Sequence, residues 1–302
     1  MAIMPRVVLV TRPSDYERLV AQHGTAQAAE FFLKSRGQSL KAVMEAYWSQ
    51  LGAVKRILNA IPLSWRRSKV DRADLDRFLF EPDDTVVVVG QDGLVANVAK
   101  YLEGQSVIGV NPSPDRFDGV LVAHGPREAE KMLEPVVRGE LLPTERTMVQ
   151  VDLDGGPEKG GQRLVALNEL FIGHRSHQSS RYEITWGAHS EAHSSSGLIV
   201  ATGTGATGWA RSICGQRSCP PLLPEPSDPW LAFMVREPFP SVATGTSITG
   251  GRVDGVMPLS IRSNFNEGGR IFGDGIEEDH LDFGWGQVAE IGVAKQRLAL
   301  VG

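Results

Sequence analysis

The sequence contains little cysteine and no long apolar run. Its 302 residues include only two cysteines, Cys214 and Cys219, which is typical of a reducing compartment and excludes a framework of several disulfides. A single bridge between these two cysteines stays open. No apolar run approaches the roughly 20 residues that a membrane-spanning helix needs. The N-terminus lacks a basic segment followed by a small-residue cleavage site. We therefore expect a cytoplasmic protein with no membrane partner, and residues 6–10 are interpreted as a first strand.

An excess of positive charge is also absent. The formal net charge is -5 at pH 7, which gives no reason to expect nucleic acid as a partner. One basic cluster occurs, WRRSK at residues 65–69, and we interpret it as a solvated loop. Glycine, in contrast, is abundant at 33 residues, which indicates many tight turns or close approaches of the backbone to a ligand.

The first half of the chain alternates between strand and helix patterns. An apolar run, a helix and a second apolar run form a βαβ unit, which favours a parallel sheet covered by helices. The longest helical pattern has Ser39 as a possible cap and Pro62 as a stop. We therefore predict an α/β domain with a parallel sheet over residues 1–141. Its expected strands are 7–10, the run of four valines at 86–89, and 106–110, and its expected helices are 26–34, 39–62, 71–80, 94–102 and 126–137.

The second half has a different pattern. Short β-type segments are separated by glycine, serine and proline clusters, which favours a β-rich domain over residues 142–302. We leave open whether its last segment returns to the first domain. The expected strands are 147–153, 163–166, 181–186, 197–201, 230–235, 258–262 and 288–294, with one helix at 207–213.

The turn Gly90-Gln91-Asp92-Gly93 lies between a buried valine strand and a helix. Free backbone N–H groups and the helix dipole at such a turn can bind an anion, and glycine lets the backbone approach phosphate oxygens. A carboxylate repels phosphate, so Asp92 is useful there only as a metal ligand or as an acceptor for a substrate hydroxyl. Both needs arise in a phosphotransferase. The alternative is a plain Asp-Gly turn.

Two further stretches are candidates for ligand binding. Residues 202–208 (TGTGATG) join a buried strand to a helix and match neither the Walker A loop nor the Rossmann fingerprint. Their hydroxyl and N–H groups, together with the first turn, favour a ligand with more than one phosphate; a flexible glycine turn is the alternative. Leu167-Asn168-Glu169 lies between two β-type runs, where an amide and a carboxylate could project from a strand edge or simply belong to a surface strand.

No metal site is predicted. His189 and His193 are four residues apart, but the glutamate stands two residues after the first histidine, which is not the zincin pattern. No third ligand has suitable spacing. Neither a Ser-His-Asp order nor a Gly-x-Ser-x-Gly elbow occurs.

The three stretches GxDG, LNE and TGTG-x-TGW, in that order, resemble the NAD kinase family and in particular its mitochondrial-type branch. The resemblance rests on residues 107–119 (VIGVNPSPDRFDG), 166–173 (ALNELFIG), 195–210 (SSGLIVATGTGATGWA) and 234–239 (MVREPF), and it extends from about residue 7 to near residue 275. The resemblance implies an NAD kinase-like fold with an α/β domain and a β-rich domain. It also implies transfer of the γ-phosphoryl group of ATP to the 2′-hydroxyl of NAD, with Mg²⁺ bridging the donor oxygens, in a homodimer.

The resemblance also implies roles for individual residues. Asp92 would orient or deprotonate the 2′-hydroxyl of NAD, and Gly90 and Gly93 would line the phosphate pocket. Asn168 and Glu169 would hydrogen-bond the dinucleotide. The other implied nucleotide-binding residues are Gln91, Asn111, Thr204, Thr207, Gly208, Trp209 and Ser212.

The chain departs from the family pattern at several positions. Gln91 stands at the second glycine of the family turn, where it adds a Cβ and a long amide, and Leu94 replaces a threonine. Trp209 replaces a tyrosine and keeps an aromatic ring for stacking. Two alternatives to an NAD kinase therefore stay open. One is a nucleotide-binding regulatory protein that lost catalysis through Gln91, and the other is a kinase for another alcohol such as a lipid.

Overall fold

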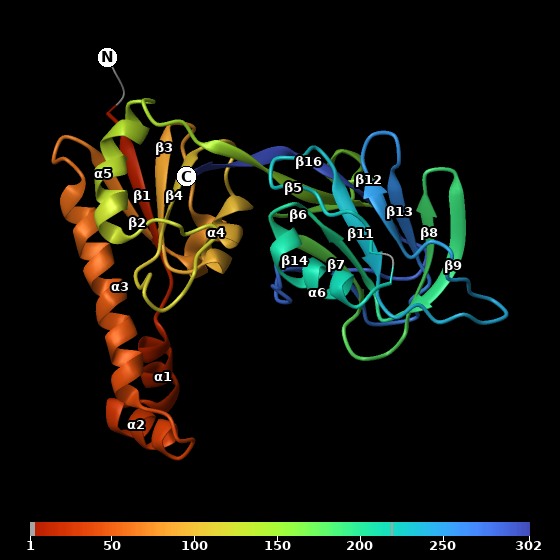
Figure 1. Cartoon of the computed structure of the whole chain (residues 1–302), viewed down its shortest axis with the longest axis horizontal. Coiled ribbons are helices and arrows are strands. Elements are labelled where there is room, and N and C mark those ends of the chain that lie inside the picture. The colour runs from red at the N-terminus through yellow and green to blue at the C-terminus, as the bar shows by residue number, and fades with distance from the viewer. Residues whose placement is uncertain (1–3, 219) are drawn as a thin grey trace. The chain divides into compact units, whose positions relative to one another are not determined.

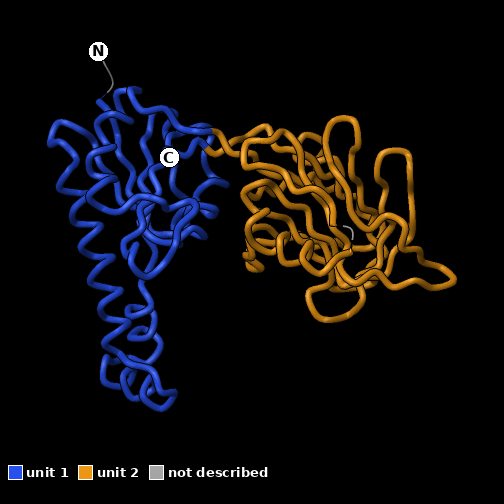
Figure 2. Tube along the Cα trace, in the orientation of Figure 1, with its two compact units in different colours: residues 1–144, 299–302 blue, residues 145–298 orange. Residues whose placement is uncertain are grey.

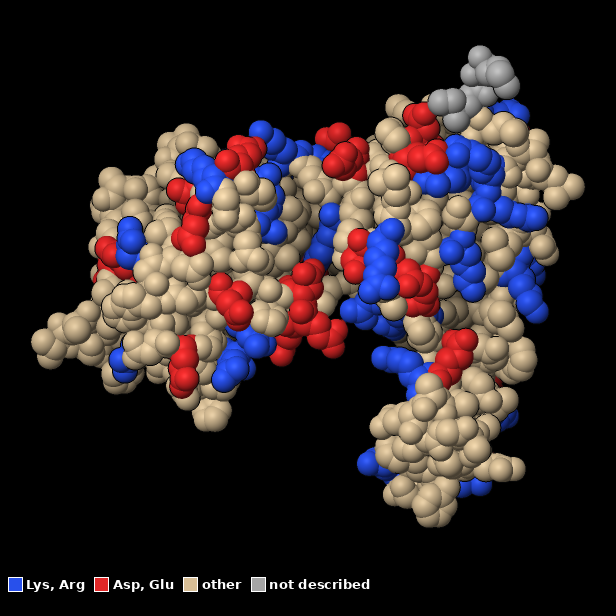
Figure 3. All heavy atoms as spheres, turned by 180° about the vertical axis from the view of Figure 1, so that it is seen from behind, with Lys and Arg blue, Asp and Glu red and all other residues tan. Residues whose placement is uncertain are grey.

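The computed structural model describes residues 4–218 and 220–302. Cys219, one of the two cysteines considered above, lies outside the described residues. The chain divides into two compact units, residues 1–144 with 299–302, and residues 145–298 (Figure 2). Acidic and basic side chains are interspersed on the face in Figure 3. Within the described residues, no helix combines the length and apolar character that crossing a membrane requires.

Unit 1 contains a parallel sheet with the strand order β2-β1-β3-β4, and residues 299–301 of β16 pair beside β4 (Figure 1). All of these neighbours run parallel. Every residue of β3 is buried, as expected for a strand covered on both faces. The predicted α/β domain with a parallel sheet is confirmed. Its strands are β1 (Arg6–Thr11), β2 (Arg66–Asp71), β3 (Asp84–Val89) and β4 (Ser106–Val110).

Helices cover both faces of this sheet. Apolar residues of α3 and α5, such as Ile57 and Leu133, form one core with Leu9, Val87 and Ile108 of the strands. Six consecutive residues of α4 are buried. The strand residues that alternate with those of the first core point to the other face of the sheet, and they are fully buried as well. The helices of unit 1 are α1 (Asp15–His23), α2 (Ala26–Lys34), α3 (Leu40–Ala60), the 3₁₀ helix η1 (Arg72–Arg77), α4 (Asp92–Ala99) and α5 (Pro126–Val137).

The interpretation of the basic cluster as a loop is wrong. Residues 66–71 form β2, which pairs with β1 at the edge of the sheet. An edge strand needs backbone partners on one side only and commonly carries charged side chains, so basic residues are compatible with it. Helix α1 was also missed, although Ser14 and Glu17 form a capping box that begins it. The weak helix expected over residues 71–80 is the 3₁₀ helix η1.

Unit 2 consists of two sheets, so the predicted β-rich domain is confirmed. In the first sheet β16 pairs with β13, β13 with β8 and β8 with β9, all antiparallel, while β5 pairs with β6 and β16. The second sheet has the order β12-β11-β10-β7-β14-β15. Residues from both sheets, among them Tyr182 and Phe233, share one apolar core.

Several strands of unit 2 were not predicted from the sequence. The strands of the first sheet are β5 (Thr144–Leu153), β6 (Gln162–Ala166), β8 (Ser180–Trp186), β9 (His189–Ser195), β13 (Leu259–Ser263) and β16 (Val288–Val301). Those of the second are β7 (Glu169–His174), β10 (Leu198–Ala201), β11 (Leu231–Val235), β12 (Gly250–Val253), β14 (Gly269–Gly273) and β15 (His280–Asp282). The helices are the 3₁₀ turns η2 (Pro157–Lys159) and η3 (Gly205–Thr207), and α6 (Trp209–Gly215).

A buried ion pair joins the beginnings of β1 and β3. Arg6 donates from Nε to Asp84 Oδ1 at 2.7 Å and from Nη2 to Asp84 Oδ2 at 2.6 Å. The side chain of Asp84 is only 1% exposed, and its Oδ2 also accepts from the backbone N–H of Glu81 at 2.8 Å. The hydrogen bond to Asp84 raises the pKa of Arg6.

Replacing Asp84 tests how much this pair contributes to unit 1. Asp84→Ala leaves the guanidinium with only the half-exposed Glu81 as an ionic partner, beside a hydrogen bond to the carbonyl oxygen of Leu79, so the free energy of unfolding should fall by about 2–4 kcal/mol in urea denaturation. Asp76→Ala is the control, because the Asp76 side chain is 60% exposed, and should change stability by less than about 0.5 kcal/mol. Equal effects of the two substitutions would contradict the structural role of the pair.

Candidate functional site

The turn at residues 90–93 lies at the carboxyl end of β3. The N–H of Gly90 donates to the carbonyl oxygen of Val110 at 3.0 Å, which joins the ends of β3 and β4. Helix α4 begins at Asp92, and Gln91, its N-cap residue, makes no side-chain cap. The N–H groups of the first helical turn are therefore not satisfied by a capping side chain, as an anion-binding turn requires.

The carboxylate of Asp92 is held by three backbone N–H groups. Oδ2 accepts from Val120 at 3.0 Å, and Oδ1 accepts from Leu121 at 2.8 Å and Val122 at 3.0 Å. Asp92 is partly buried. The side chain is thus fixed against the loop that follows β4, and its orientation is set before any ligand binds.

The loop over residues 111–124 is itself shaped by Asn111. This residue is 3% exposed, its Nδ2 donates to the carbonyl oxygen of Phe117 at 2.8 Å, and its Oδ1 accepts from the N–H of Ser113 at 2.9 Å. Both ends of the Asn111 amide are therefore engaged within the loop. The loop packs closely on β4, because a Cβ on Gly109 would lie 1.8 Å from the carbonyl oxygen of Leu121.

The two glycines of the turn differ in what surrounds them. A Cβ on Gly90 would lie 3.1 Å from Cδ2 of Leu94, whereas a Cβ on Gly93 would meet no atom within 4 Å. Neither glycine has a positive φ. Neither backbone strain nor packing within the described residues therefore requires glycine at position 93. The space in front of this residue is open to a ligand.

In unit 2 the structure brings the LNE and TGTG stretches into contact. The hydroxyl of Thr202 donates to the carbonyl oxygen of Leu167 at 2.6 Å, and the backbone N–H of Thr202 donates to the carbonyl oxygen of Asn168 at 2.9 Å. A Cβ on Gly205 would lie 2.2 Å from the carbonyl oxygen of Asn168, so only glycine fits there. Asp274 accepts from the N–H groups of Leu167 at 3.1 Å and Asn168 at 2.7 Å.

Glu169 stands out electrostatically. Burial is the main cause that raises its pKa to about 7, and the negative charge of Asp274 adds to the rise. A carboxyl group with such a pKa exchanges its proton near neutral pH, so it can either donate or accept a hydrogen bond from a ligand. Strongly raised pKa values of this kind are common at functional sites.

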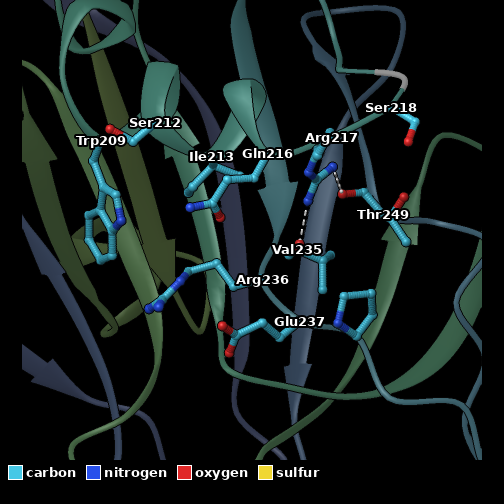
Figure 4. A pocket seen from close by; sticks show the side chains of 11 residues that line it. Trp209, Ser212, Ile213, Gln216, Arg217, Ser218, Val235, Arg236, Glu237 and Thr249 are labelled. Carbon is cyan, nitrogen blue, oxygen red and sulfur yellow. Dashed lines mark hydrogen bonds between the residues drawn. The ribbon is translucent and has the colours of Figure 1, made fainter.

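Trp209, at the start of α6, borders a cavity of about 570 Å³ (Figure 4). Its ring stacks on Phe171 with centroids 5.8 Å apart, and the guanidinium carbon of Arg236 lies 5.1 Å from the Trp209 centroid. Arg217 donates to the carbonyl oxygens of Thr249 and Val235 at the opposite end of the close-up. The cavity is lined by Trp209, Ser212, Ile213, Gln216, Arg217, Ser218, Val235, Arg236, Glu237, Pro238 and Thr249.

The other predicted residues of the glycine-threonine loop differ in exposure. Thr207 and Gly208 are exposed, while Thr204 is 4% exposed. The hydroxyl of Thr207 donates to the carbonyl oxygen of Thr204 at 3.3 Å. Within the described residues, the Oγ1 atom of Thr204 is buried without a hydrogen-bond partner. Ser212 lines the cavity beside Trp209.

Several residues around these stretches were missed from the sequence. Asp274 lies between two glycines, as Asp92 lies near Gly90 and Gly93, and this repeated pattern could have identified it. Arg236 is part of the MVREPF stretch that carried the family resemblance. Phe171 lies in the ALNELFIG stretch, which also carried the resemblance, but no role was predicted for it. Arg217 stands in no motif, and the N–H groups that hold Asp92 belong to the backbone, which a side-chain pattern does not reveal.

The histidine pair near residue 190 lies on an edge strand. In β9, His189, Glu191 and His193 point to one side because alternate residues of a strand share a face. His193 is 1% exposed and its Nε2 lies 2.8 Å from Glu191 Oε2. Glu191 also accepts from the N–H groups of Ser247 and Ile248, each at 2.9 Å. Among the described residues no group of three or more His, Cys, Asp or Glu side chains could hold a metal ion.

Solved structures share the fold of this chain. The crystal structure of an NAD kinase from Archaeoglobus fulgidus in complex with ATP matches with a TM-score of 0.61 at 19% identity, covering 98% of this chain and 93% of that one. Yeast NADH kinase complexed with NADH matches with a TM-score of 0.61 at 14% identity, covering 100% and 84%. The fold is therefore that of the NAD kinases, as the resemblance implied.

Curated relatives lead to the same family. NAD kinase 2, mitochondrial, from Homo sapiens is 27% identical over 261 residues, covering 69% of this chain and 58% of the relative. The NAD kinase of Pseudomonas putida is 30% identical over 189 residues (61% and 59%), and that of Bacteroides fragilis is 31% identical over 137 residues (44% and 45%). The chain thus spans roughly half the length of the curated relatives it matches.

The motif resemblance is confirmed by these matches: in sequence and in fold, the chain is a relative of the NAD kinases. No family model matches the chain.

The raised pKa of Glu169 predicts how stability depends on pH. Its pKa rises from 4.5 to about 7 in the folded chain, so between these values the folded state keeps a proton that the unfolded chain has released. The free energy of unfolding should therefore fall as pH rises through this window, by up to about 3 kcal/mol at roughly 1.4 kcal/mol per pH unit. Urea denaturation between pH 5 and pH 8 measures it.

Glu169→Gln should remove this fall, because the neutral amide carries no charge to bury. The variant should become more stable than the parent above pH 7, while the two converge toward pH 5. Glu278→Gln, at an exposed position, is the matched control and should follow the parent at every pH. Parallel curves for the parent and Glu169→Gln would show that burial does not perturb this carboxyl group.

Proposed function

We propose that the chain is an NAD kinase, which transfers the γ-phosphoryl group of ATP to the 2′-hydroxyl of the adenosine ribose of NAD and gives NADP. The observation that carries the proposal is Asp92, an oriented carboxylate at the start of α4. The names of the curated relatives and of the structural neighbours support the same reaction. Cytoplasmic location and a homodimer, both implied above, stay predictions.

In unit 1, the turn at residues 90–93 would take the donor. Uncapped N–H groups at the start of α4 and the open space at Gly93 suit phosphate oxygens. Asp92 would accept a hydrogen bond from the 2′-hydroxyl and orient it for attack on the γ-phosphorus. Because phosphoryl transfer passes through a loose transition state, this orientation contributes more than the base strength of the carboxylate. Mg²⁺ enters as part of the MgATP substrate and neutralises donor oxygens.

In unit 2, the contacting LNE and TGTG stretches would bind the dinucleotide. Glu169 and Asn168 would hydrogen-bond its polar groups, and the raised pKa of Glu169 lets its carboxyl group donate at neutral pH. Trp209 would provide apolar ring surface beside the exposed Thr207 and Gly208. The role proposed for Asn111 is indirect, because its amide shapes the loop that orients Asp92.

A second candidate is a nucleotide-binding regulatory protein of the same fold with little turnover. The observation in its favour is the side chain of Gln91 at the N-cap of α4, where a bare backbone would approach phosphate more closely. Tight binding of NAD or NADP in calorimetry without formation of NADP would favour this candidate. A kinase for another alcohol, such as a lipid, would instead transfer labelled phosphate from ATP to that alcohol and not to NAD.

Asp92→Asn tests the proposed reaction. With ATP, Mg²⁺ and NAD, the parent should form NADP, measured with an NADP-specific dehydrogenase. The variant should lose about 100-fold or more in kcat, because a neutral amide orients the hydroxyl less firmly than a carboxylate does and also cannot take its proton. It should also lose about 1–3 kcal/mol of stability, because its NH₂ group would face a backbone N–H of residues 120–122.

Arg116→Ala separates catalysis from loop structure. Arg116 ties the same loop to α3 through the carbonyl oxygen of Ala42 at 3.1 Å and through Glu45, without contacting Asp92. If Asp92 only anchors the loop, both variants should lose activity in proportion to their lost stability. A kcat loss confined to Asp92→Asn supports the proposed role, and a fully active Asp92→Asn rejects it.

Gly93→Ala tests whether the backbone of the turn approaches the donor. A Cβ at this position meets no atom within 4 Å, and alanine is favoured over glycine in a helix by about 1 kcal/mol, so stability should be kept or rise slightly. The KM for ATP should rise at least about fivefold, because the methyl group occupies space that a phosphate needs. Gly52→Ala in α3, which also has no atom within 4 Å, is the control and should leave KM unchanged.

A further inference from the structure

Three neighbouring strands of unit 1 end at the same edge of the sheet with polar side chains. The order β2-β1-β3 is parallel throughout, so the carboxyl ends of these strands lie side by side. Arg72 follows β2, Arg12 follows β1, and Gly90 with Gln91 follow β3. Ligands of open α/β sheets bind at this edge. Two guanidinium groups therefore accompany the glycine turn there.

Gln91 contacts Arg12 directly. The guanidinium Nη2 of Arg12 donates to the amide oxygen of Gln91 at 2.6 Å. Gln91 is the N-cap residue of α4, but its side chain makes no hydrogen bond to the helix. The backbone of Arg12 is fixed as well, because Nε2 of Gln50 donates to its carbonyl oxygen at 2.7 Å. The side chain at the second position of the turn thus holds a cation instead of capping the helix.

The positive charge of Arg12 is not matched by an acid. Within the described residues it forms no ion pair, and its one hydrogen bond from the side chain goes to a neutral amide. Burial is the main cause that lowers the pKa of Arg12, and the like charges of Arg18 and Arg72 lower it further, against the opposite effect of Asp15. Asp15 itself pairs with Arg18. An anion bound at this edge would relieve the repulsion among the three guanidinium groups.

We propose that Arg12 binds the triphosphate of the donor nucleotide, and that Gln91 is a positioning residue that directs the Arg12 guanidinium to the turn at residues 90–93. This inference rests on the proposed function. It assigns to Arg12 the phosphate contacts that the backbone cannot make because position 91 carries a side chain. A planar guanidinium binds two phosphate oxygens at once, so it can replace contacts that a bare backbone would make. A triphosphate carries more charge than the pyrophosphate of a dinucleotide and suits a multiply charged edge better.

The test separates donor binding from acceptor binding in the full-length chain. ATP binding in the presence of Mg²⁺ is measured by isothermal titration calorimetry, and NADP formation is measured with ATP and NAD varied in turn. Arg12→Gln should weaken ATP binding and raise the KM for ATP about tenfold or more, with the KM for NAD unchanged. Arg12→Lys, which keeps the charge, should recover part of the loss.

The role of Gln91 is tested by a double-mutant cycle. Gln91→Gly should raise the KM for ATP by a smaller factor than Arg12→Gln, because the guanidinium stays but is no longer held. The KM for ATP of the double variant should not exceed that of Arg12→Gln, because both substitutions act on the same contact. Arg77→Gln is the control, because it removes the same charge from a side chain that is 82% exposed, and it should leave both KM values unchanged.

The outcomes distinguish this inference from the proposed function. If the parent makes NADP and Arg12→Gln binds ATP like the parent, the inference is overturned and the proposed function stands. A rise in the KM for NAD alone would assign Arg12 to the dinucleotide and also overturn it. If the parent binds ATP but makes no NADP, the proposed function fails, and weaker ATP binding by Arg12→Gln still supports the inference. A parent that does not bind ATP overturns both. If Arg12→Gln fails to fold, Arg12→Lys and Gln91→Gly decide in the same way.

Discussion

The carboxylate of Asp92 depends on three backbone N–H groups of one loop, and the candidate site in unit 1 depends on that carboxylate. Backbone donors cannot change rotamer, so they fix both oxygens more firmly than side chains would. The loop can supply them because Asn111 folds it and Gly109 lets it lie on β4. The carboxylate of Asp92 is therefore positioned by main chain, and side chains act mainly by shaping that main chain.

Unit 2 uses the same arrangement a second time. Asp274, at a φ of 56°, accepts the N–H groups of Leu167 and Asn168, and this places Glu169 at the beginning of β7. The difference lies in the surroundings. The buried Glu169 feels the charge of Asp274, which helps to raise its pKa, so one carboxyl group fixes the backbone while its neighbour can exchange a proton.

The sequence predicted those elements whose pattern is local. Strand β4 and helix α5 begin and end where their apolar spacing indicated, and the valine run of β3 is buried on both faces. Strand β9 (HSEAHSS) was not predicted, because its polar residues fit a strand only through pairing with β8. The motifs at residues 90–93 and 202–208 are also local patterns, so they could be found in the sequence. The hydrogen bond between Gln91 and Arg12 could not be predicted, because it joins residues far apart in the sequence.

Strand β9 lies at the end of its sheet, and such a strand offers unpaired backbone groups to other chains. Here the chain occupies part of that margin itself. The N–H groups of Phe239 and Gly245 donate to the carbonyl oxygens of Ser194 and Ala192, and the inward carboxylate of Glu191 takes the N–H groups of Ser247 and Ile248. The segment at residues 239–248 therefore covers part of the edge of β9, which leaves fewer backbone groups of this strand free to pair with a strand of another chain.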